Sequence, residues 1–139
     1  MSADEVVLGF DFGTTNSLAS VVVGEELITF LDNEQPIPSV VSFEGGKVEV
    51  GRKAHDKLTS AGLGVRGSTV RSPKSLLGKD ELIIDGVRRD PVQMVEHVLH
   101  HVREFVLQTK TGRGLKMERV VATIPVNMEG RRRGLLRQA

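Results

Sequence analysis

An acidic residue, a glycine and two threonines stand close together near the amino end of the chain. Asp11 ends an apolar run, and Gly13, Thr14 and Thr15 follow within four residues. Glycine has no Cβ, so backbone N–H groups beside it can approach a ligand closely, and successive turn amides can form an anion-binding nest. The threonine hydroxyls add further donors. We interpret this turn, extended by Asn16, as a candidate phosphate site.

The acidic residue needs a separate explanation, because a carboxylate repels phosphate. Asp11 fits such a turn if a divalent cation lies between the two groups, since Mg²⁺ prefers oxygen ligands and keeps several waters. We therefore predict that Asp11 holds Mg²⁺ beside the phosphates. An ordinary hairpin with polar turn residues explains the spacing equally well.

Two other phosphate motifs are absent from this segment. It lacks Gly-Lys-Ser/Thr running into a helix, and it lacks Gly-x-Gly-x-x-Gly opening a helix. The segment instead resembles the first phosphate motif of the actin, sugar-kinase and heat-shock chaperone superfamily. Its run Asp-Phe-Gly-Thr-Thr-Asn-Ser is specifically similar to that of the seventy-kilodalton heat-shock chaperones, the DnaK-like proteins.

Four further segments resemble the same family in the same order, so the resemblance extends along nearly the whole chain. Residues 68–78 are similar to the stretch around the family's catalytic lysine, which falls on Lys74. The other three segments are similar to the family's Pro-Ser-x-Val-x-Phe strand, its Gly-x-x-Ala turn into a helix, and its Thr-Val-Pro strand with the helix after it; they are residues 38–43, residues 50–54, and residues 120–125 with Arg133.

The resemblance implies an α/β fold that is ribonuclease H-like and actin-like. The chain would form the first part of lobe one of an ATPase domain, with a mixed sheet, antiparallel amino-terminal hairpins and helices. Residues 1–35 and 91–139 would form an incomplete inner subdomain, and residues 36–90 a small inserted outer subdomain. The last predicted helix is interrupted at Ala139, which indicates a piece of a longer protein.

The same resemblance implies roles for particular residues. Asp11 would hold Mg²⁺ through water, and residues 13–16 would contact the phosphates of ATP or ADP. Lys74 would touch the γ-phosphate and orient the attacking water, because a point charge on a flexible stem can stabilise charge on the transferring phosphoryl group. Asp11 and Lys74 are thus the predicted catalytic residues. Outside this context, Lys74 would be read as a solvated surface lysine.

Two residues match positions by which the family passes nucleotide state to its substrate-binding domain. They are Pro125, a proline switch, and Arg133, a relay arginine. A proline that ends a strand and an arginine on a helix surface are simpler explanations. The surrounding sequence also departs from the family here, and Gly134 would weaken the helix by about 1 kcal/mol relative to alanine. Interdomain signalling is therefore in doubt for this chain.

The leading hypothesis is an ATP-dependent chaperone whose nucleotide state controls polypeptide binding during protein folding and stress. Its partners would be unfolded polypeptides and co-chaperones, met through the full-length protein. The alternatives are a small-molecule, sugar-type kinase of the same superfamily and a non-catalytic interaction module. We expect residues 1–139 alone to be inactive as an ATPase, because half of the cleft would be missing. Exposed apolar surface is expected to drive self-association.

The patterns of apolar and turn residues predict the elements of the fold. The long helix is the strongest prediction, because Asp90 is a good N-cap, Pro91 suits the first helical position, and apolar residues recur at three- and four-residue steps. The predicted strands are 5–11, 17–23, 26–31, 39–43, 47–50, 82–84, 87–88 and a buried strand at 120–124; the predicted helices are 52–60, a turn at 75–77, 91–110 and one capped by Asn127.

The composition excludes several classes of function. Nineteen Lys and Arg face 18 Asp and Glu, a formal net charge of +1, so no general affinity for nucleic acid or membrane is expected. There is no cysteine for disulfides, thiolate metal sites or Cys nucleophiles, and no Trp or Tyr for stacking bases. No apolar stretch approaches a membrane span or a secretory signal. A cytoplasmic protein is predicted.

Two other clusters are less informative. His97 and His101 lie one helical turn apart near Glu104, but no third metal ligand is obvious, so a solvated polar face is favoured. Residues 131–133 are three arginines in a row, which more commonly form exposed surface than a nucleic-acid site.

Overall fold

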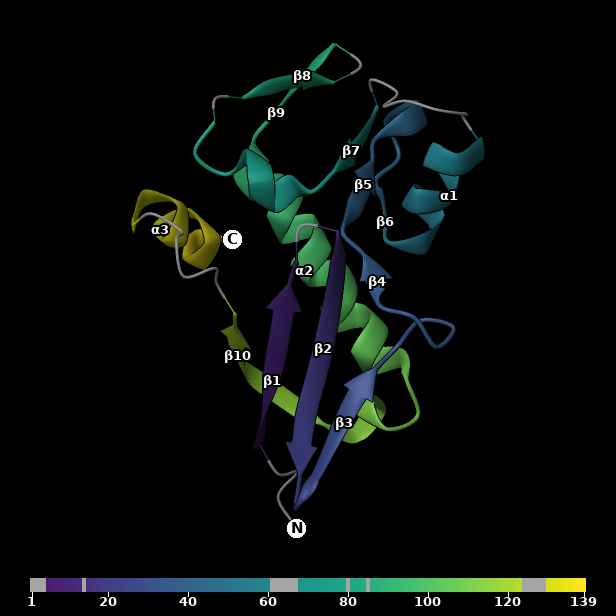
Figure 1. Ribbon diagram of the computed structural model, residues 1–139, viewed down its shortest axis with the longest axis vertical. Coiled ribbons are helices and arrows are strands. Elements are labelled where there is room, and N and C mark those ends of the chain that lie inside the picture. The colour runs from purple at the N-terminus through teal and green to yellow at the C-terminus, as the bar shows by residue number, and fades with distance from the viewer. Residues whose placement is uncertain (1–4, 14, 61–67, 80, 85, 124–129) are drawn as a thin grey trace.

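A computed structural model of the protein describes residues 5–13, 15–60, 68–79, 81–84, 86–123 and 130–139 (Figure 1). Its main sheet has the strand order β10-β1-β2-β3, with the short β4 pairing with β2. The pairs β1/β2 and β2/β3 are antiparallel, whereas β1/β10 is parallel. The strands are β1 (Glu5–Phe12), β2 (Asn16–Val23), β3 (Glu26–Phe30), β4 (Ile37–Pro38) and β10 (Lys116–Ala122).

The alternation of residues along β1 decides which side chains can reach a ligand. Leu8, Phe10 and Phe12 are buried, whereas Val7 and Asp11 are exposed. Successive side chains of a strand point to opposite faces, so the even-numbered residues enter the core and Asp11 lies on the other face. The mixed α/β architecture with antiparallel amino-terminal hairpins is as predicted.

The long helix α2 (Pro91–Gln108) runs behind the main sheet and supplies the other half of the core (Figure 1). Asp90 Oδ1 accepts a hydrogen bond from Val92 N at 2.9 Å, so the predicted N-cap forms. The predicted helix is confirmed and ends two residues early. Its buried side chains interleave with those of the sheet; they are Pro91, Val92, Met94, Val95, Val98, Val102 and Val106.

The elements between β4 and α2 lie together at one end of the molecule (Figure 1). A three-stranded sheet with the order β6-β5-β7 lies beside α1 (Arg52–Ser60), and the hairpin β8/β9 is separate from it. The two hairpins and the helix were predicted, but the pairing of β5 with β7 was not. The bounds are β5 (Val40–Ser42), β6 (Glu49–Val50), β7 (Thr69–Arg71), β8 (Leu82–Ile84) and β9 (Val87–Arg89), with 3-10 turns η1 (Glu44–Gly46), η2 (Pro73–Leu76) and η3 (Gly112–Gly114).

The strand expected at 120–124 differs from the prediction in two ways. It begins earlier, at Lys116, and it is not buried, because Val120 and Val121 are 53% and 62% exposed. The reason is position: β10 lies at an edge of the described sheet, so its apolar run gains a neighbour on one side only. The last helix is α3 (Gly130–Gln138), and its predicted cap Asn127 lies outside the described residues.

Among the described residues, no helix combines the length and the apolar character needed to cross a membrane.

Candidate phosphate-binding site

The turn between β1 and β2 is closed by its own backbone. Gly13 N donates to Asn16 O at 2.9 Å, and a Cβ built on Gly13 would stand 2.6 Å from that oxygen. Gly13 is therefore needed for the close approach of the two strands. Its N–H group is engaged within the hairpin, which differs from the expectation that this amide faces a ligand. Thr15 and Asn16 are exposed, and Thr14 lies outside the described residues.

Ser39, the buried residue that directly follows β4, makes hydrogen bonds to this turn. Ser39 Oγ donates to Gly13 O at 3.2 Å, and Ser39 N donates to Thr15 O at 2.9 Å. The hydroxyls of Ser39 and Ser17 are 2.8 Å apart, and both residues are fully buried. Sequence reasoning missed these roles. The available signal was the Pro-Ser pair at 38–39, within a segment already matched to the family.

Asp11 stands at the exposed carboxyl end of β1. Its Oδ1 accepts a hydrogen bond from Thr123 Oγ1 at 2.7 Å, and Thr123 N donates to Phe10 O at 2.9 Å. The contact follows from topology, because the parallel strands β1 and β10 end at the same edge of the sheet. Within the described part of the chain, no three His, Cys, Asp or Glu side chains gather as a metal-binding group.

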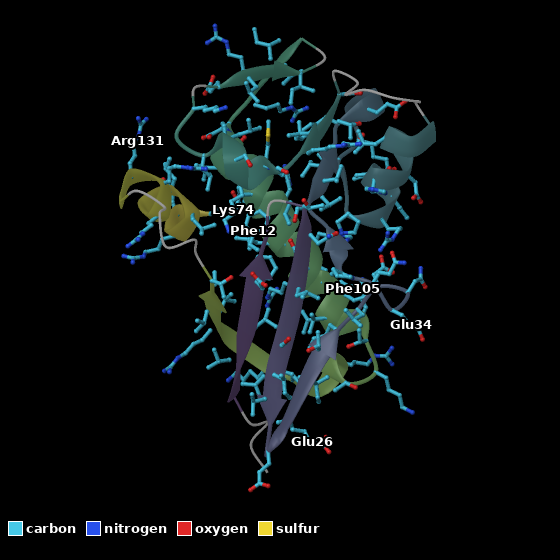
Figure 2. The ribbon with its side chains drawn as sticks, in the orientation of Figure 1. Phe12, Glu26, Glu34, Lys74, Phe105 and Arg131 are labelled. Carbon is cyan, nitrogen blue, oxygen red and sulfur yellow. The ribbon has the colours of Figure 1, made fainter. Side chains whose placement is uncertain are left out.

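Lys74 reaches the same end of β1 from η2. Its Nζ donates to Phe12 O and lies 5.5 Å from the centroid of the Phe12 ring (Figure 2). The residue is only 4% exposed, so the solvated surface lysine considered from sequence is wrong. Burial lowers the pKa of Lys74, while the charge of Asp11 raises it and that of Arg132 lowers it. Because Phe12 directly follows Asp11, the structure brings Lys74 to the same end of the sheet as Asp11.

An arginine of α3 contacts the segment that carries Lys74, and the sequence did not predict this contact. Arg132 Nη2 donates to Lys74 O at 3.2 Å, and Arg132 Nε is buried without a hydrogen-bond partner among the described residues. Arg133 is exposed and lines a groove instead. Pro125 lies outside the described residues. Sequence reasoning could not choose between adjacent arginines, because the choice depends on the rotation of α3 about its axis.

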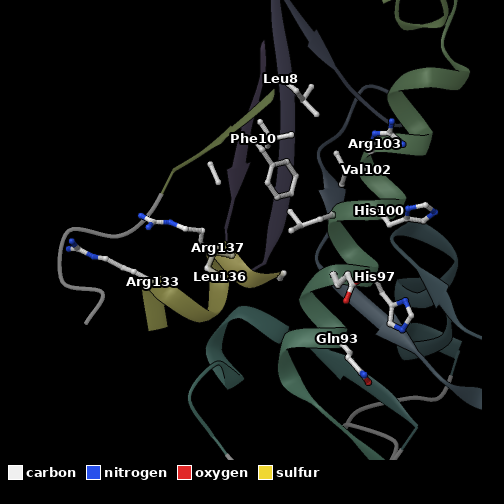
Figure 3. Close-up of a pocket in the computed structure, with 15 residues that line it drawn as sticks. Leu8, Phe10, Gln93, His97, His100, Val102, Arg103, Arg133, Leu136 and Arg137 are labelled. Atoms are coloured by element: carbon white, nitrogen blue, oxygen red, sulfur yellow. The ribbon is translucent and has the colours of Figure 1, made fainter. Parts of the chain in front are cut away.

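A large groove lies apart from Asp11 and Lys74, neither of which lines it. It has a volume of about 1030 Å³ and opens between β1, β10, α2 and α3 (Figure 3). Leu8 and Phe10 form part of its apolar wall, and Arg133 and Arg137 enter from α3. The groove therefore does not coincide with the place where the predicted phosphate-binding residues lie.

His97 and His101 of α2 are half-buried and contact neighbouring elements, which corrects the expectation of a solvated face. His97 makes an edge-on contact with Phe43, with ring centroids 6.1 Å apart. His101 Nε2 would stand 2.8 Å from a Cβ on Gly51, which has φ +77° and so favours glycine. Burial lowers the pKa of both histidines. These contacts join α2 to the 36–90 segment.

Comparison with known proteins places the chain in a class. The sequence model of the Hsp70 protein family matches residues 7–136. Chaperone protein DnaK of Mycoplasmopsis pulmonis is 28% identical over 134 residues, which is 94% of this chain and 21% of that protein. Chaperone protein DnaK of Ureaplasma urealyticum is 30% identical over 138 residues, which is 97% of this chain and 22% of that protein.

The match covers most of the chain, and the chain therefore belongs to the Hsp70 family. It spans about a fifth of the length of the curated relatives that it matches.

Proposed function

We propose that this chain supplies one wall of the ATP–Mg²⁺ site of an Hsp70-type chaperone. The observation that carries the proposal is the meeting of Lys74 with the end of β1, where Phe12 O accepts from its Nζ beside Asp11. A cation, an exposed carboxylate and a tight turn with exposed polar residues are the groups that a magnesium-bound triphosphate needs. Membership of the Hsp70 family supports the same conclusion.

The residues around the turn would have different roles in binding Mg²⁺ and the phosphates. Bound Mg²⁺ would neutralise phosphate charge, and the exposed Asp11 carboxylate would hold it through water, which fits an ion that keeps most of its waters. Thr15, Asn16 and Thr14 would offer polar groups to the phosphates, while Gly13 keeps the turn narrow.

Lys74 would exchange one acceptor for another when nucleotide binds. Its present acceptor, Phe12 O, is a neutral carbonyl, whereas a phosphate oxygen carries negative charge and attracts the ammonium group more strongly. A phosphate within reach would therefore draw Nζ away from the carbonyl. Because Lys74 is buried, its charge is little screened by water, which strengthens its hold on a phosphoryl group.

In the longer protein, ATP hydrolysis at the completed site would control the binding of unfolded polypeptides, with co-chaperones setting the cycle and the cytoplasm as the location. The actin-like and ribonuclease H-like description of the fold, and the division at residues 36–90, belong to the same proposal. Roles for Pro125 and Arg133 in interdomain signalling also stay predictions. The chain alone should bind nucleotide weakly and should not turn it over.

Nucleotide titration followed by NMR tests the proposal at the concentrations that weak binding requires. Adding Mg-ADP at millimolar concentrations should shift the amide signals of Thr15, Asn16 and Lys74. Lys74→Met should weaken binding about tenfold or more, because a hydrogen bond to a charged group contributes about 1.5–3 kcal/mol. Lys79→Met is the matched control, since Lys79 is exposed on the same segment.

Asp11→Asn should remove the dependence of binding on Mg²⁺ while keeping an acceptor for Thr123. The proposal fails if Mg-ADP shifts none of these signals, or if the substitutions of Lys74 and Lys79 have equal effects.

A further inference from the structure

Ser39 is connected to two separate parts of the proposed site. Its hydroxyl donates to Gly13 O, and its backbone N–H donates to Thr15 O. The hydroxyls of Ser39 and Ser17 lie 2.8 Å apart and either can donate; when Ser39 donates to Gly13 O, Ser17 Oγ is the donor in this contact. On its other side, Ser39 O accepts from Ser72 N at 3.1 Å.

The contact with Ser72 continues directly to Lys74. Ser72 is the N-cap residue of η2 and has a left-handed backbone with φ 53°, an uncommon conformation for a residue other than glycine. Its orientation starts the 3-10 turn in which Lys74 is buried, and Lys74 Nζ returns to Phe12 O. These hydrogen bonds, with the backbone that links their residues, therefore form a closed ring from the end of β1 through Ser39 and Ser72 to Lys74.

We propose that Ser39 is a positioning residue that sets the distance between Lys74 and the turn that joins β1 to β2. The role of this spacing in nucleotide binding rests on the proposed function, but the spacing itself does not. Without the hydroxyl, Gly13 O and the Ser17 hydroxyl would each lose a buried partner, and buried polar groups without partners are costly. The turn would move to recover partners, and of the direct bonds between this turn and Ser39 only the backbone bond from Ser39 N to Thr15 O would remain.

Ser42 offers a matched control within the same segment. It is also fully buried, and its hydroxyl accepts from Thr69 Oγ1 and from Glu44 N, each at 3.3 Å. Neither of these contacts involves the turn between β1 and β2. Ser42→Ala should thus lower stability for the same physical reason as Ser39→Ala without moving Lys74.

The test measures the reactivity of Lys74 toward an acylating reagent by mass spectrometry, with the exposed Lys79 as internal reference. Ser39→Ala should raise the ratio of Lys74 to Lys79 labelling about threefold to tenfold, the factor expected for loss of one hydrogen bond. Ser42→Ala should leave the ratio unchanged. Equal ratios in the two variants, or no change in Ser39→Ala, would overturn the proposal.

Titration with Mg-ADP separates this proposal from the proposed function. A Ser39→Ala variant with raised Lys74 labelling and weaker Mg-ADP binding than Ser42→Ala supports both. Raised labelling in a protein that does not bind Mg-ADP supports the positioning role and refutes the nucleotide site.

Should Ser39→Ala fail to fold, native-state amide exchange of the unaltered chain decides the question. The amides of Ser39 and Ser72 should then open with the same free energy, because a closed ring opens as one unit; different opening free energies would overturn the proposal.

Discussion

Gly13→Ala is the substitution whose cost follows most directly from the structure. The new Cβ would stand 2.6 Å from Asn16 O, closer than such contacts occur. That oxygen cannot simply retreat, because it accepts the 2.9 Å hydrogen bond from Gly13 N that closes the turn. The strands β1 and β2 must therefore either tolerate the overlap or separate at their hydrogen-bonded end.

The loss of stability can be worked out for each of the two outcomes, overlap of the new Cβ with Asn16 O or separation of the strands. Overpacking costs about 1–3 kcal/mol, and loss of the closing hydrogen bond costs about 0.5–1.5 kcal/mol. Alanine also restricts the unfolded chain, which returns about 0.4–1 kcal/mol. Overpacking therefore leaves a net cost of up to about 2.6 kcal/mol and strand separation one of up to about 1.1 kcal/mol. We expect the free energy of unfolding to fall by about 0.5–2 kcal/mol, which lowers Tm by about 2–8 °C for a domain of this size. Urea titration followed by circular dichroism measures it.

Gly134→Ala is the control for Gly13→Ala. A Cβ on Gly134 meets nothing within 4 Å, and α3 should gain about 0.5–1 kcal/mol from the better helix former. The two substitutions should change stability in opposite directions. If Gly13→Ala is neutral or stabilising, the turn is wider than described and the reasoning about its closure is refuted.

Three further predictions concern the contacts around the site. Burial lowers the pKa of His101, so as the pH falls the unfolded chain is protonated at this residue before the folded chain is. The free energy of unfolding should therefore fall as the pH drops from about 7 to 5. His101→Gln should flatten this pH dependence in urea titrations, and an unchanged slope would contradict the prediction. Arg132→Gln should lower the free energy of unfolding by about 0.5–1.5 kcal/mol, because its bond to Lys74 O is lost. Arg131→Gln on the exposed face of the same helix should change it by no more than about 0.5 kcal/mol, and equal losses in the same assay would contradict the assignment. Val121→Lys on the edge strand should reduce self-association in sedimentation experiments, and a wild-type chain that stays monomeric at high concentration would refute this expectation.

Local patterns predicted the elements whose stability is local. The apolar stripe and the Asp90 cap located α2, and alternation with turn residues located the strands of both amino-terminal hairpins. Asp11 and the turn after it were also recognisable as a candidate site, because acid, glycine and hydroxyl residues lie within a few positions of one another.

Contacts between segments far apart in the sequence could not be predicted from local patterns. The exposure of Val120 depends on where β10 lies in the sheet, and the burial of Lys74 depends on Phe12, which precedes it by 62 residues. Ser39 and Arg132 act through backbone carbonyls, which every residue carries and which leave no mark in a sequence.

The sequence by itself thus determined the types of chemical group and the local elements that hold them, since propensity and periodicity act over a few residues. Only the tertiary structure decided which of those groups meet, because strand order, helix rotation and burial are set by packing across the whole chain. Asp11 and Lys74 could be named from the sequence, and the fold brought them to one end of the sheet.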